Sequence, residues 1–114
     1  MEDLLIETLS TFSYPVMLQG SLLPNEPYPD DFFTFWNKDS SDGTHYDNAA
    51  ASVLYEYEVN FYSNNPENVY SVLRATITKL RTAGFIIGGD GYSVASDEPT
   101  HDGRGVDVEY LRRV

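Results

Sequence analysis

The feature that most constrains the fold is a strict alternation of side chains near the middle of the chain, followed at once by a helical pattern. From position 55 to position 61, Tyr, Tyr, Val and Phe alternate with Glu, Glu and Asn. A period of two is typical of a β-strand with one buried face and one solvated face. From position 66 onward, apolar side chains recur at spacings of three and four, which predicts an amphipathic helix over 66–83 packed on the sheet. The side chains expected on its buried face are Val69, Val72, Leu73, Ile77 and Leu80.

The remaining residues supply a second helix and several more strands. A helix is expected over 2–12, where leucines recur on one side and two carboxylates occupy the first turn. The expected strands cover 16–18, 32–36, 53–62, then 85–87 and 92–94 around a glycine-rich turn, and 106–110. The sequence therefore predicts a single α+β domain over 1–114. Two helices pack on a mainly antiparallel sheet in the order α-β-β-β-α-β-β.

The charge of the chain excludes one broad class of partner. The formal net charge is −11, from 18 acidic and seven basic side chains. Residues 1–50 hold nine acidic side chains and one basic side chain, a net of −8. Binding a phosphate backbone requires neutralisation by Lys and Arg, so we expect no direct nucleic-acid binding. The acidity serves solubility alone, repels passing DNA, or binds a basic protein.

The amino-acid usage also points to a compartment. The chain has no cysteine, which excludes disulfides and Cys-ligated zinc sites. Its first residues lack the basic region of a signal peptide, and no apolar run approaches the roughly 18 residues that cross a bilayer. We expect no membrane association, and a protein kept in a cytoplasm unless it leaves within a larger assembly.

Residues that could form a metal site are few. His101 lies near Asp97 and Asp102, where imidazole and carboxylates are compatible with a metal site. The alternative is a turn in which short polar side chains bond their own backbone. The acidic segment 39–50 lacks the Gly and Glu that an EF-hand needs at its sixth and twelfth positions. We expect no metal ligand and no cofactor.

No pattern selects a catalytic group. The glycine-rich segment 88–91 lacks the Lys and Ser/Thr of a phosphate-binding loop. Asp107 and Glu109 alternate on a strand, and neither of the two lysines, Lys38 and Lys79, is expected to stand beside that pair. They are read as a solvated face rather than as a nuclease pair. The sequence therefore predicts no catalytic residue and no enzyme.

Aromatic residues and long connections favour protein contacts instead. The chain holds nine Tyr, six Phe and one Trp, and such side chains are enriched at interfaces. Residues 37–48 are either a contact arm or a hairpin connection. Phe32 and Trp36 are expected on one face of a strand and near the surface, unless the two helices cover both faces. The residues predicted to form an interface are Phe32, Trp36, Tyr46, Arg104 and Arg112.

Two stretches resemble a known group of proteins. They are YPVMLQGSLLPNEPYPDDFFTFWN, from position 14, and GYSVASDEPTHDGRGVDVEYL, from position 91. Together they resemble small tail proteins of siphophages and prophages of Gram-positive bacteria, near the tail-terminator or tail-completion family. The resemblance implies a hexameric ring that stops growth of the tail tube and joins tail to head.

Three classes of function follow as hypotheses. In the first, the protein is a structural tail component that forms a ring through sheet edges and loops, and contacts tail-tube and head–tail connector proteins. Acidic residues 26–47 and the basic Arg104, Arg112 and Arg113 would be complementary patches. It would reside in the virion tail, and in the host cytoplasm during assembly. In the second, it is an acidic decoy that binds a DNA-binding protein. A small hydrolase is the least favoured alternative.

Overall fold

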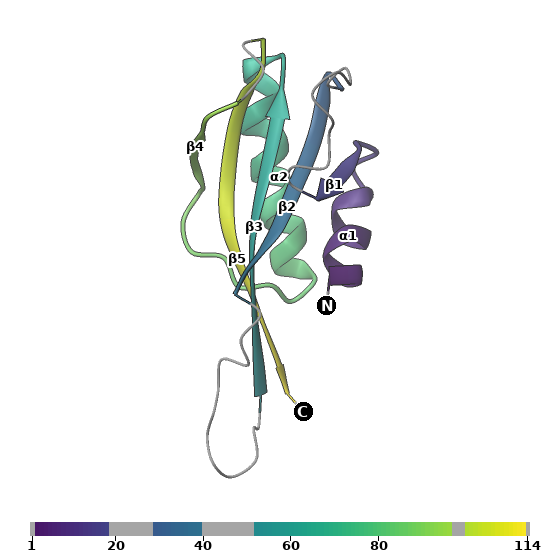
Figure 1. Cartoon of the computed structure of the whole chain (residues 1–114), viewed down its shortest axis with the longest axis vertical. Helices are drawn as coiled ribbons and strands as arrows, with labels where there is room; N and C mark the ends of the chain where they lie inside the picture. The colour runs from purple at the N-terminus through teal and green to yellow at the C-terminus, as the bar shows by residue number, and fades with distance from the viewer. Residues whose placement is uncertain (1, 19–28, 40–51, 97–99, 114) are drawn as a thin grey trace.

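The computed structural model describes residues 2–18, 29–39, 52–96 and 100–113 (Figure 1). Its elements follow the predicted order. They are α1 (Glu2–Ser10), β1 (Val16–Leu18), β2 (Asp31–Asp39), β3 (Ser52–Ser63), α2 (Pro66–Thr82), β4 (Tyr92–Val94) and β5 (Asp102–Arg113). The predicted α+β class is confirmed. Among the described residues, no helix is long and apolar enough to cross a membrane.

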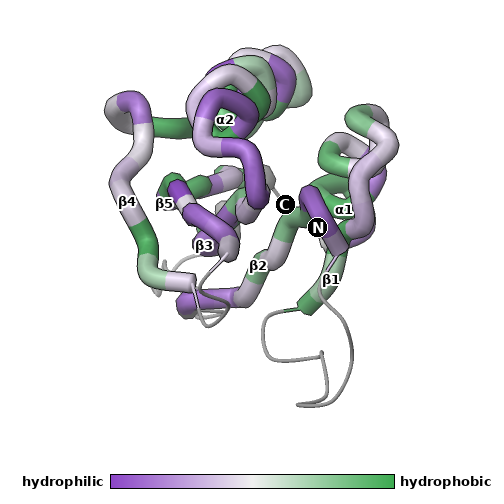
Figure 2. The backbone as a smooth tube through the Cα atoms, turned by 90° about the horizontal axis from the view of Figure 1, so that it is seen from above, coloured by the Kyte–Doolittle hydropathy of each residue, from purple (hydrophilic) through white to green (hydrophobic). Residues whose placement is uncertain are grey.

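The strands form one mixed, mostly antiparallel sheet in the spatial order β1-β2-β3-β5-β4. β1 runs parallel to β2, and the other pairs are antiparallel. The two helices lie on the same side of the sheet, with α2 over β3 and β5 and α1 beside β1 (Figure 2). The sheet therefore has a helix-covered inner face and an outer face, and successive strand residues alternate between the two.

The ends of α2 show why the helix lies where the sequence predicts it. The side chain of Asn65 accepts a hydrogen bond from the backbone N–H of Glu67 at 3.1 Å, and Pro66 occupies the first helical turn. Ala83 caps the other end, and Gly84 has a φ of 105°, which only glycine adopts readily. Of the predicted buried face, only Val72 is not fully buried. The buried residues of α2 are Val69, Leu73, Thr76, Ile77 and Leu80.

The hydrophobic core lies between the inner face of the sheet and the two helices. Phe33 of β2 packs against Phe61 of β3 with ring centroids 4.8 Å apart, and both are fully buried. Leu5 and Leu9 of α1 close the same core beside β2. Burial of such side chains contributes about 1.5–3 kcal/mol each, so this layer dominates the stability of the domain.

Several predicted boundaries are wrong, among them those of β5, which covers Asp102–Arg113 rather than 106–110. Residues 85–87 are not a strand, because Ile86 makes only an isolated bridge to Glu109. Phe85 and Ile87 instead point into the core while Ile86 is exposed. β2 runs to Asp39, three residues beyond the prediction, because it pairs with β3 along its whole length. α1 ends at Ser10 rather than at residue 12, because the next residues form a turn.

Candidate functional site

The outer face of the sheet holds two of the predicted interface residues, Phe32 and Trp36. Only the second is exposed: Trp36 keeps 45% of its surface, whereas Phe32 keeps 2%. The ring of Phe32 stacks on Tyr62 at 5.2 Å and lies 5.9 Å from the ring of His101. The expected exposure of Phe32 is therefore wrong. The alternative, in which the helices cover both faces, is also wrong, because both helices lie on the inner face.

His101 explains the burial of Phe32. The imidazole Nε2 lies 2.8 Å from the carbonyl oxygen of Pro29, and Nδ1 lies 3.1 Å from the hydroxyl of Thr100. The bond to Pro29 holds His101, just before β5, beside the start of β2, and this contact encloses Phe32. His101 is thus bound to backbone, and its proposed metal partner Asp97 lies outside the described residues. Within the described ranges, no three His, Cys, Asp or Glu side chains are grouped so as to hold a metal ion.

A polar cluster occupies the middle of the outer face. Asp107 Oδ1 accepts hydrogen bonds from Lys38 Nζ at 3.1 Å and from the hydroxyl of Tyr92 at 2.8 Å. The same hydroxyl lies 3.4 Å from Glu58 Oε1. Burial, the hydrogen bond to Asp107 and the charge of Glu58 raise the pKa of Tyr92 well above its ordinary value. The hydrogen bond to Asp107 also raises the pKa of Lys38.

This cluster corrects one inference from the sequence. Lys38 stands beside Asp107 in space although 69 residues separate them in the chain. Asp107 and Glu109 are both exposed, as the reading of a solvated face requires. Across β3 and β5, Glu58 lies opposite Asp107 and Glu56 lies opposite Glu109. Like charges directly opposed across strands are destabilising, and Lys38 offsets part of the repulsion within this four-carboxylate block.

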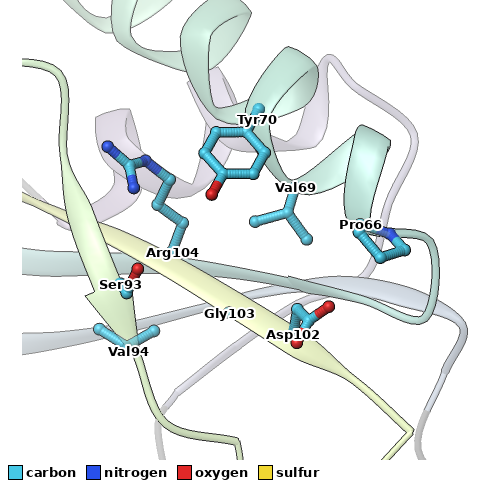
Figure 3. A pocket seen from close by; sticks show the side chains of 8 residues that line it. All are labelled: Pro66, Val69, Tyr70, Ser93, Val94, Asp102, Gly103 and Arg104. Carbon is cyan, nitrogen blue, oxygen red and sulfur yellow. The ribbon is translucent and has the colours of Figure 1, made fainter.

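Arg104 lies on the inner face rather than at a free end of the chain. Its guanidinium donates a hydrogen bond from Nη2 to the carbonyl of Gly91 at 3.1 Å and lies 5.1 Å from the ring centroid of Tyr70. The two side chains border a pocket of about 270 Å³ between α2 and β4, together with Val69, Val94 and Asp102 (Figure 3). The predicted interface residue is therefore part of a recess.

The long strands β3 and β5 project beyond the rest of the sheet (Figure 1). β2 ends at the pair Asp39 and Glu56, whereas β3 and β5 stay paired to Ser52 and Arg113. Residues 52–55 and 110–113 thus form a two-stranded ribbon, hereafter the β3–β5 ribbon. Beyond the Ile86 bridge, no described strand pairs with either of its outer edges. Of the predicted interface residues, Arg112 belongs to this ribbon by its backbone, and Tyr46 lies outside the described residues.

The sequence held a partial signal for these surfaces. Arg74 and Arg81 are seven residues apart on α2, a spacing that places them on one side of a helix. No local pattern indicates that Tyr92 and Lys38 meet at Asp107, because three strands supply the three groups.

A comparison with protein-family models found no model that matches this chain, and a comparison with curated proteins found no relative.

Proposed function

We propose that this chain is a structural subunit of a phage or prophage tail that assembles into a closed ring through its sheet edges. On this proposal it is a tail terminator or head–tail joining protein, hexameric as in the family that it resembles. It acts without catalysis, cofactor or direct nucleic-acid contact. Its partners are further copies of itself, the tail-tube protein and the connector, in the virion tail and earlier in the host cytoplasm.

The β3–β5 ribbon is the observation that supports this proposal most. A two-stranded ribbon is marginally stable on its own in water, and unpaired edges bind another strand readily. Both of its strands are long, whereas the edge strands β1 and β4 have three residues each. The ribbon and the short edges are different surfaces on one subunit. A ring requires such a heterologous contact, in which one patch meets a different patch on the next copy.

The edge can be blocked without disturbing the ribbon itself. Glu109 exchanges both backbone hydrogen bonds with Ile86, so its N–H and C=O point away from β3. Because this direction alternates along an antiparallel strand, the N–H of Leu111 also points outward. Leu111→Pro removes that donor and spares the bonds between β3 and β5. Leu111→Ala is the matched control, since it keeps the N–H and removes the exposed side chain.

Light scattering over a concentration series, with and without tail-tube protein, tests the proposal. We expect a discrete oligomer that Leu111→Pro weakens and Leu111→Ala largely retains. A strict monomer under all these conditions contradicts the proposal. Equal assembly by both variants shows instead that this edge is not the contact.

The four-carboxylate block favours a second candidate function. An acidic decoy needs contiguous carboxylates, and Glu56, Glu58, Asp107 and Glu109 are adjacent on the outer face. Tight, salt-sensitive binding of a strictly monomeric protein to a basic DNA-binding protein would support this function over the ring. Loss of that binding in Glu56→Gln/Glu109→Gln would assign it to the block, with Glu67→Gln on α2 as control.

A further inference from the structure

A groove with an unusual charge runs along α2 on the side of β4. The pocket of about 270 Å³ adjoins a second pocket of about 100 Å³, and both are bordered by Tyr70 and Arg104. Pro66, Val69 and Val94 supply apolar walls at one end, which Asp102 also borders, as seen in Figure 3. The other end lies between α2 and the loop that contains Asp90. The groove thus offers a partly apolar recess that continues into a polar channel.

Three of the seven basic side chains of this acidic protein line the groove. They are Arg74 and Arg81 of α2 and Arg104 of β5, against the two carboxylates Asp90 and Asp102. The local balance is positive, whereas the net charge of the whole chain is −11. An anionic partner is therefore attracted to this groove and repelled by most of the remaining surface.

Two of these arginines are held in place by backbone. Nη2 of Arg81 donates to the carbonyl oxygen of Ile87 at 2.9 Å, and Nη2 of Arg104 donates to that of Gly91. A guanidinium has five N–H donors, and its planar fork matches a carboxylate. Because these side chains are already fixed, they lose less conformational entropy when they bind a carboxylate. The exposed Tyr70 and the apolar end add a contact for an aromatic or aliphatic side chain.

We propose that this groove binds the acidic segment 39–47 of a second copy of the chain. That segment carries Asp39, Asp42 and Asp47, which match three arginines in number, and Tyr46 for the apolar recess. This inference rests on the proposed ring, for which it supplies the contact between unlike patches. The flanking Asp39 and Ser52 lie at the end of the sheet opposite to Asp102, which borders the first pocket. On the proposed ring, a neighbouring subunit supplies the segment.

The first test uses a synthetic peptide of residues 37–48 and isotope-labelled full-length protein. In an NMR titration, we expect amide shifts centred on Tyr70, Val94 and Arg104. Arg74→Gln should weaken binding about two- to fivefold, the range of one exposed ion pair. Arg74 is exposed, so this variant keeps the fold. Lys79→Gln, an exposed cation of α2 outside the groove, should bind as the wild type does. A peptide with Asn at the three Asp positions should not bind.

Three results would overturn the inference. They are no shifts at the groove, equal binding by the Arg74→Gln and Lys79→Gln variants, and displacement of the peptide by millimolar inorganic phosphate, which marks a general anion site. The second test is assembly of Arg74→Glu against Lys79→Glu by light scattering. We expect Arg74→Glu to weaken the oligomer. Adding Asp42→Arg to the same chain should restore assembly. If the peptide binds but assembly is unchanged, the segment does not come from a second copy.

The two proposals fail separately. If the wild type forms a ring and the Arg74→Glu variant forms it equally well, the groove is wrong and the ring stands. If the wild type remains monomeric while the peptide binds the groove, the ring is wrong. The groove then binds acidic segments of another source, which overturns its assignment to a second copy.

Discussion

Gly105 lies in the middle of β5, with Asn60 of β3 and Tyr92 of β4 as its two cross-strand partners. A Cβ atom at this position would clash with Asn60 Oδ1, so only glycine fits without movement. In the same register, Tyr92 lies opposite Gly105, and its hydroxyl donates to Asp107 Oδ1 at 2.8 Å. Gly105 therefore packs directly beside the polar cluster of the outer face.

We expect Gly105→Ala to lower the free energy of unfolding by about 1–3 kcal/mol, as overpacking does. Gly88→Ala is the control, because a Cβ atom there has no heavy atom within 4 Å and should change stability by less than about 0.5 kcal/mol. Urea unfolding of the two variants measures the difference. Equal stabilities would contradict the packing described at Gly105.

Tyr92 gives a second prediction at this scale. Its folded-state pKa is raised above the ordinary value of 10.0, so the folded protein keeps this proton at pH values where the unfolded chain loses it. The raised pKa of Tyr92 therefore contributes to the stability of the fold. This contribution is fully present below pH 10 and is lost as the pH rises through the folded-state pKa. The wild type should therefore lose stability more steeply above pH 10 than Tyr92→Phe, in denaturant unfolding at a series of pH values. Parallel curves would show that Tyr92 does not bond Asp107.

At the scale of elements, α2 depends on local signals and the strand ends do not. The Asn65 cap, Pro66 and Gly84 act within a few residues of the helix, and the sequence alone predicts both ends to within one residue. The end of β2 depends on pairing with β3, and the role of Ile86 depends on Glu109. Contacts between residues far apart in the chain produce no periodic pattern in the sequence. For the same reason, the exposure of Phe32 was predicted wrongly, since His101 covers it from a distant segment.

The buried face of α2 makes a prediction for the whole element. Leu73 is 1% exposed and belongs to the central core, so Leu73→Ala should cost about 2–5 kcal/mol of unfolding free energy. Thr78→Ala on the exposed side of the same helix should cost less than about 0.5 kcal/mol. Guanidinium unfolding compares the two. A loss below about 0.5 kcal/mol for Leu73→Ala would show that this face is not core.

At the scale of the whole molecule, the domain is long for its size. Its extents are 51 × 28 × 22 Å and its radius of gyration is 15.0 Å, against about 13 Å for a compact domain of roughly this length. The β3–β5 ribbon extends along the long axis (Figure 1). The four-carboxylate block lies on the outer face, and the arginine-lined groove lies on the helix side. A subunit with a projecting ribbon and two oppositely charged surfaces is suited to repeated contacts with copies of itself, which is the basis of the proposed ring.

Native mass spectrometry of the protein at increasing concentration, alone and with tail-tube protein, tests the proposed ring most directly, because it counts subunits. We expect one dominant assembly whose mass, after subtraction of any bound tube protein, is six times the 12.9 kDa of the chain. A series of species without a preferred number would indicate open polymers rather than a closed ring. A mass of 12.9 kDa under every condition would contradict the proposed ring.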